Sequence, residues 1–236
     1  NFQLLSKSTA LSVPTLTAQL RLRGIDVLPI DANVEAFDSI LTAGKLNELR
    51  DRIEERLREF GQRDQLNHTD QLNYVAMVRA LPAANEVPKL IEDAKATLRD
   101  ASRFADPESY DRATAIIDHA MTVVSAAYSP LKLDFTTYRT PFSMLTIEEV
   151  EKDASVERNP FFDWVETVRG PRLRAAEVNV VGLSVCFPGQ LQPAYSFALQ
   201  LKRLLPGVHL TVGGPGVTQM MKIGRASCRE RVSLNV

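Results

Sequence analysis

Two short loops carry the residue types that could bind a ligand. Ser184 ends one apolar run and offers a hydroxyl group, and the turn that follows is expected to expose backbone amides. A second apolar run ends at Gly213. Because glycine has no Cβ, the backbone there can approach a flat or phosphorylated ligand closely. The residues of these loops that could bind a ligand are Ser184, Gly213, Gly214 and Gly216.

Simpler structural roles remain open for the same residues. A pair such as Gly213-Gly214 often makes only a tight turn between a strand and a helix. A serine such as Ser184 often caps the next helix or bonds to its own backbone. The case for a ligand site therefore depends on both loops meeting in the fold.

Metal chemistry by the chain's own side chains is not expected. The chain has 2 cysteines, Cys186 and Cys228, too few for a disulfide framework or a zinc site. Its 3 histidines are His68, His119 and His209, and we interpret each as structural. Any metal chemistry is therefore expected to come from a bound cofactor or from a segment missing from this sequence.

The apolar runs before both loops have the pattern of buried parallel strands. Val178–Val185 and Val208–Val212 are almost continuously apolar, as in strands covered on both faces. A helix over Gln190–Leu205 separates them, and this order implies a parallel crossover that brings both strand ends to one edge of the sheet. Ile25–Ile30, which follows a short helix over Thr15–Leu22, is predicted to join the same sheet.

The middle of the chain is predicted to be mainly helical. Leu46, Leu49 and Ile53 recur at intervals of three and four residues, which is the spacing of one helix face. Pro82 is expected to separate two helices. A short extended segment is predicted over Leu131–Tyr138 because apolar and polar residues alternate there.

Together these patterns predict an α/β fold: an incomplete Rossmann-like (flavodoxin-like) parallel sheet with a large, mainly helical insertion. Residues 1–33 are assigned to the first part of the sheet domain, residues 34–177 to the insertion and residues 178–221 to the second part. Residues 222–236 are predicted to be a non-native tail, because they resemble the translation of a sequencing-adapter oligonucleotide; a natural basic tail is the alternative. The chain starts without methionine, so upstream sequence is expected as well.

The sequence around both loops resembles a known family. VVGLSVCFPGQ at Val180–Gln190 and VHLTVGGP at Val208–Pro215 are similar to the second half of the cobalamin-binding domain that precedes the catalytic domain in many radical SAM enzymes. Pro14–Asp31 resembles the first helix and second strand of that domain. The Asp-x-His-x-x-Gly loop of classical cobalamin domains is not in the chain, and many radical SAM members lack its histidine as well.

The resemblance implies roles for the predicted site. Ser184, Val185 and Cys186 would line the pocket of the cobalamin nucleotide, and the glycines from Gly213 to Gly216 would pass beside the nucleotide tail. The parent protein would hold a [4Fe-4S] cluster and S-adenosyl-L-methionine in a separate catalytic domain, and would be a methyltransferase or a related radical enzyme with an unidentified substrate. The fragment itself would bind the cofactor at most.

Two other functions remain as alternatives. A non-catalytic, flavodoxin-like ligand-binding or regulatory module fits the same strands. A nucleotide-sugar glycosyltransferase fragment could use the glycine loop, although no acidic metal-binding pair follows a strand.

Composition excludes several classes of partner. With 28 basic and 29 acidic residues the net charge is -1, so neither a nucleic acid nor an anionic membrane is an expected partner. No apolar run reaches the roughly 18 to 20 residues of a membrane span, and the first residues do not show a basic flank followed by an apolar segment. The cytoplasm is the expected location.

Overall fold

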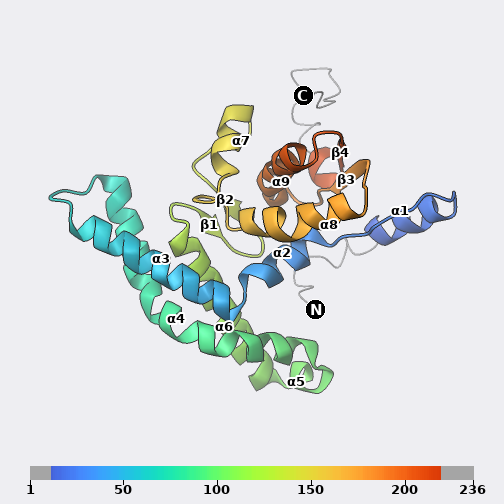
Figure 1. Cartoon of the computed structure of the whole chain (residues 1–236). Helices are drawn as coiled ribbons and strands as arrows, with labels where there is room; N and C mark the ends of the chain where they lie inside the picture. The colour runs from blue at the N-terminus through green and yellow to red at the C-terminus, as the bar shows by residue number, and fades with distance from the viewer. Residues whose placement is uncertain (1–11, 219–236) are drawn as a thin grey trace. The chain divides into compact units, whose positions relative to one another are not determined.

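The computed structural model describes residues 12–218, which divide into two compact units that interleave along the sequence (Figure 1). Unit 1 contains residues 32–141 and 157–161. Unit 2 contains residues 12–31, 142–156 and 162–218 of the described chain. Both loops of the predicted binding site therefore belong to unit 2. The tail predicted over residues 222–236 lies outside the described residues.

Unit 1 is built mainly from helices. They are α2 (Ala32–Ile40), α3 (Ala43–Gly61), α4 (His68–Arg99), α5 (Ala101–Ala105) and α6 (Pro107–Ala127). Helices α3, α4 and α6 pack against one another (Figure 1). Leu46, Leu49 and Ile53 lie in the core between them, each with at most 2% of its surface exposed, so the predicted helix face is confirmed.

The expected break at Pro82 does not occur. Helix α4 continues through both Pro82 and Pro88. A proline inside a helix removes one backbone hydrogen bond and costs about 3 kcal/mol, so packing must offset that cost. Ala80, Ala84 and Ile91 of the same helix are fully buried. Tertiary burial has overridden the local signal, and the sequence-based helix boundary was wrong.

The segment predicted to be one extended stretch turns back on itself. Strands β1 (Lys132–Leu133) and β2 (Tyr138–Arg139) pair antiparallel. The side chain of Asp134 accepts hydrogen bonds from the backbone nitrogens of Thr136 (2.7 Å) and Thr137 (2.8 Å). These bonds fix the turn between the strands, as Asp side chains commonly do.

A buried lysine joins α2 to α4. Lys95 is 4% exposed, and its Nζ donates to the backbone oxygen of Leu41 (2.9 Å) and lies 2.8 Å from a carboxylate oxygen of Asp38. Arg99 also donates to Asp38 at 2.8 Å. Partial burial raises the pKa of Asp38, but the bonds from Lys95 and Arg99 outweigh it, so this pKa lies below its ordinary value of 3.8.

An arginine of α3 donates hydrogen bonds at the C-terminus of α6. The guanidinium of Arg56 donates to the backbone oxygens of Ala127 (3.1 Å) and Ser129 (3.0 Å). The last carbonyl groups of a helix have no partner within the helix, and a cation there also complements the helix dipole. Arg56 therefore ties α3 to the C-terminus of α6.

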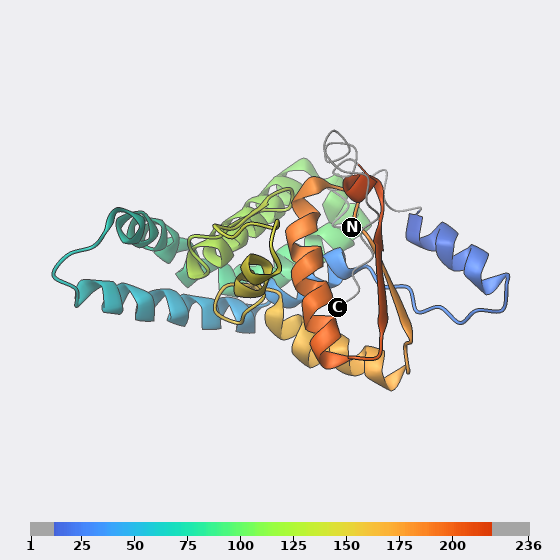
Figure 2. The same cartoon turned by 90° about the horizontal axis from the view of Figure 1, so that it is seen from above.

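Unit 2 combines helices with a strand-helix-strand segment. Its elements are α1 (Ser12–Arg21), α7 (Ile147–Asp153), a π-helical segment η2 (Trp164–Arg169), α8 (Gly170–Ala175), β3 (Val180–Ser184), a 3-10 turn η3 (Pro188–Gln190), α9 (Leu191–Leu204) and β4 (His209–Gly213). Strands β3 and β4 pair in parallel, with Val180 opposite His209 and Ser184 opposite Gly213. Helix α9 runs alongside the strands (Figure 2).

The predicted fold class is wrong. The described residues contain only two sheets of two strands each and are mainly helical, so they hold no Rossmann-like parallel sheet. Ile25–Ile30, predicted to be a third parallel strand, is irregular, and Ile25 is 49% exposed. Residues of β3 and β4 alternate between exposed and half-buried, with Val180 60% exposed. One face of the sheet is therefore open, whereas continuous apolar runs indicated burial on both faces.

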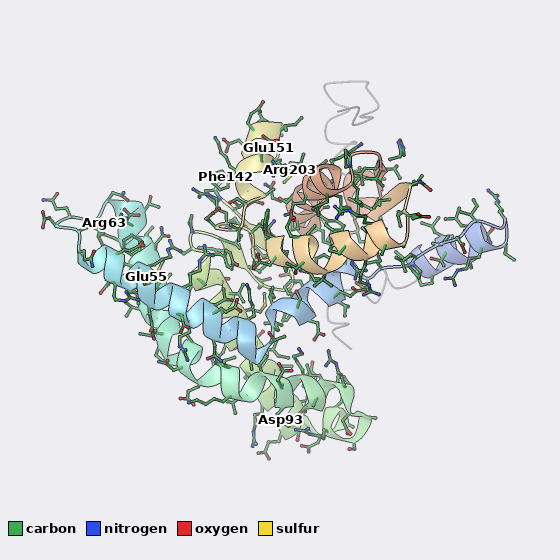
Figure 3. The ribbon with its side chains drawn as sticks, in the orientation of Figure 1. Glu55, Arg63, Asp93, Phe142, Glu151 and Arg203 are labelled. Carbon is green, nitrogen blue, oxygen red and sulfur yellow. The ribbon has the colours of Figure 1, made fainter. Side chains whose placement is uncertain are left out.

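Polar side chains hold α7 on α9. A carboxylate oxygen of Asp153, which is 1% exposed, accepts hydrogen bonds from Ser196 (3.1 Å) and Gln192 (3.4 Å). At the surface, Arg203 of α9 lies 3.4 Å from a carboxylate oxygen of Glu151 of α7 (Figure 3). These bonds place α7 beside the helix that leads from β3 to β4.

No helix within the described ranges is both long and apolar enough to cross a membrane.

Candidate functional site

The structure brings the ends of the two apolar strands together. Ser184 and Gly213 are partners in the parallel register. Just beyond them, the nitrogen of Val185 donates to the backbone oxygen of Gly213 at 2.8 Å. The sequence-based expectation that these two strand ends are neighbours is confirmed.

Gly214 and Gly216 are needed for contact between the two loops. Gly214 has φ +105°, a conformation that L side chains rarely adopt, and a Cβ there would lie 2.3 Å from the oxygen of Val185. A Cβ on Gly216 would lie 3.2 Å from backbone atoms of Phe187, and the Gly216 nitrogen donates to the oxygen of Val185 at 3.0 Å. Both glycines therefore let backbone approach backbone. For Gly214, this agrees with the simpler structural role left open for the Gly213-Gly214 pair.

Gly213 differs from its neighbours. It is exposed, and a Cβ built on it would meet no atom within 4 Å. Ser184, its partner across the sheet, is also exposed, and Cys186 is half-buried. Val185 is only 2% exposed. Of the predicted site residues, Ser184, Gly213 and part of Cys186 are thus accessible to a ligand, whereas Val185 and Gly216 are buried.

The turn after β3 does not offer the free amides expected of it. The nitrogens of Cys186 and Phe187 donate to Oε1 of Gln190, at 2.9 Å and 3.2 Å. The nitrogen of Gln190 in turn donates to the backbone oxygen of Phe187 at 3.0 Å. A ligand at this edge would therefore meet the Ser184 hydroxyl and open backbone surface rather than a set of free amides.

Gln190 was not among the predicted site residues. The signal that could have identified it is local: a glutamine three residues after Phe187, with a proline between them, has the spacing of a helix-capping glutamine. The side chain of such a residue turns back to the amide before the helix. Sequence reasoning assigned Gln190 only to the start of the helix.

The described residues contain no group of three or more His, Cys, Asp or Glu side chains placed to hold a metal ion. What the edge of β3 and β4 can offer a ligand is one hydroxyl, a half-buried thiol and a stretch of unobstructed backbone. The absence of a Cβ at Gly213 allows a ligand to approach the backbone closely there. No protein-family model, curated protein or solved structure was found that matches the chain.

Proposed function

We propose that the edge formed by Ser184 and Gly213 binds the nucleotide tail of cobalamin, and that the chain is the cobalamin-binding part of a cobalamin-dependent radical SAM enzyme. The observation that carries the proposal is the pairing of Ser184 with Gly213, with open space over Gly213. The sequence resemblance of both loops to cobalamin-binding domains supports it.

The described residues fit the cofactor in part. Gly213 leaves room for a tail to lie against the backbone, Ser184 can donate or accept a hydrogen bond, and Cys186 borders the same edge. Gly214 and Gly216 would act indirectly, because their close contacts shape the loops. When bound, cobalamin would supply methyl-group transfer, and the chain's residues would hold and orient it.

Other parts of the proposed function concern the parent protein. A [4Fe-4S] cluster and S-adenosyl-L-methionine would belong to a catalytic domain outside the described residues, and the substrate is unidentified. The protein would work in the cytoplasm. Its near-zero net charge favours neither a nucleic-acid partner nor an anionic membrane.

The test is retention of the cofactor by a glycine variant. The protein is reconstituted with hydroxocobalamin and desalted, and its visible spectrum is recorded. Gly213→Val fills the open space, so we expect it to lose corrin absorbance that the wild type retains. Gly207→Val is the matched control, because Gly207 precedes the opposite end of β4 and a Cβ there also meets no atom within 4 Å. A wild type without corrin absorbance, or a Gly213→Val variant that retains it fully, would refute the proposal.

A further inference from the structure

One side chain connects the turn after β3 to the start of α9. Oε1 of Gln190 accepts from the nitrogens of Cys186 and Phe187, and the Gln190 nitrogen donates to the Phe187 oxygen. The turn between Ser184 and α9 is thus fixed mainly by the hydrogen bonds of one half-buried residue, Gln190.

We propose that Gln190 is the positioning residue of this site: it fixes the turn that presents Ser184 and Cys186, without touching the ligand through its oxygen. The ligand part of this inference rests on the proposed function, since it takes cobalamin as the molecule bound. The positioning part concerns the free protein and can be measured without any ligand.

Among residues 12–218, these two amides have no partner other than Gln190. Pro188 has no backbone N–H, and the 3-10 turn Pro188–Gln190 leaves the Cys186 and Phe187 nitrogens ahead of the helix, where helical hydrogen bonds do not reach them. Two successive N–H groups that converge on one point commonly bind an anion. Here the glutamine oxygen takes that position, so the turn is already ordered before a ligand arrives, which lowers the entropic cost of binding.

Two variants separate the acceptor from the rest of the side chain. Gln190→Leu keeps the size and removes the acceptor, whereas Gln190→Glu keeps an acceptor oxygen in the same place. We expect amide hydrogen exchange at Cys186 and Phe187 to become about tenfold faster or more in Gln190→Leu, as for the loss of one hydrogen bond. Exchange in Gln190→Glu should stay within about threefold of the wild type.

Gln71→Leu is the control for the substitution itself. The Gln71 amide donates to the oxygen of Leu66 in unit 1, so its loss should leave both amides of the β3 turn unchanged. Unchanged exchange at Cys186 and Phe187 in Gln190→Leu would overturn the inference, and so would equal acceleration in Gln190→Glu.

Hydroxocobalamin titration of the same variants tests the ligand part. We expect the Kd to rise about tenfold in Gln190→Leu and to be restored in Gln190→Glu, with Trp164 fluorescence showing that unit 2 stays folded in both. If Gln190 only stabilised the fold, the Kd would rise only in a variant whose Trp164 fluorescence shows a loss of folding. A raised Kd in a folded Gln190→Leu protein and a restored Kd in Gln190→Glu therefore point to the acceptor oxygen. If the wild type binds no cobalamin, the proposed function fails, and the exchange rates still decide the positioning role.

Discussion

Replacement of Gly214 with alanine tests how closely the two loops depend on each other. At φ +105° an L residue is strained, which costs about 1–3 kcal/mol. The new Cβ would lie 2.3 Å from the Val185 oxygen and 2.9 Å from its nitrogen, so that backbone must move. Overpacking of this kind adds about 1–3 kcal/mol. We expect Gly214→Ala to lower the free energy of unfolding of unit 2 by about 2–6 kcal/mol in total.

Urea unfolding followed by tryptophan fluorescence measures this loss. Trp164 is the chain's 1 tryptophan and lies buried in unit 2, so its signal reports that unit. Because m values are about 1–3 kcal/mol per molar urea, the midpoint should fall by about 1 M or more. Gly213→Ala is the matched control: its Cβ meets no atom within 4 Å, and the expected change is within about 0.5 kcal/mol. Equal midpoints for the two variants would refute the reasoning.

Three further predictions concern individual side chains. Arg56→Met should destabilise unit 1 by about 1–3 kcal/mol because the backbone oxygens of Ala127 and Ser129 lose their donor. Arg58→Met removes only an exposed ion pair with Glu55 and should cost under about 1 kcal/mol; helical circular dichroism during urea unfolding separates the two variants. Gln200 is 1% exposed, and within the described part of the chain neither of its side-chain polar atoms has a hydrogen-bond partner. Gln200→Met should therefore raise the urea midpoint measured by Trp164 fluorescence, whereas Gln192→Met, which removes a donor to Asp153, should lower it. Because the folded-state pKa of Asp38 is depressed, the stability that this carboxylate contributes is present above its ordinary pKa of 3.8 and is lost as the pH falls further. Asp38→Asn should reduce the fall of the unit 1 urea midpoint across that pH range, and the rest of the fall should remain because the pKa values of Asp100, Asp106 and Asp134 are lowered as well.

The local elements around the site could be predicted from sequence because their signals are local. The apolar runs at Val178–Val185 and Val208–Val212 correspond to β3 and β4, and their parallel pairing was expected. The helix between them was predicted to within a residue or two at both ends. A strand-helix-strand order leaves few ways to pair neighbouring strands.

The number of strands and the roles of the site residues could not be predicted in the same way. Ile25–Ile30 is as apolar as a strand, but a strand also needs an edge to pair with, and that edge is set by distant residues. Gly214 and Gly216 looked like ligand-facing glycines, although only the partner loop shows that they face Val185 and Phe187. In each case the sequence does not reveal which other backbone segment faces these residues in the folded protein.

The outer sides of β3 and β4, which run along the strands and are distinct from the strand ends at Ser184 and Gly213, affect how the protein behaves at high concentration. Within residues 12–218 each strand pairs only with the other, so each has a second edge with backbone donors and acceptors that no strand covers. Such an edge is a template on which further strands assemble, and natural proteins usually block it with charges, prolines or bulges. The five residues of β3, VVGLS, include none of these. Aggregation through added strands is therefore expected to begin at β3 and β4, which are five residues long, rather than at the two-residue strands β1 and β2 of unit 1.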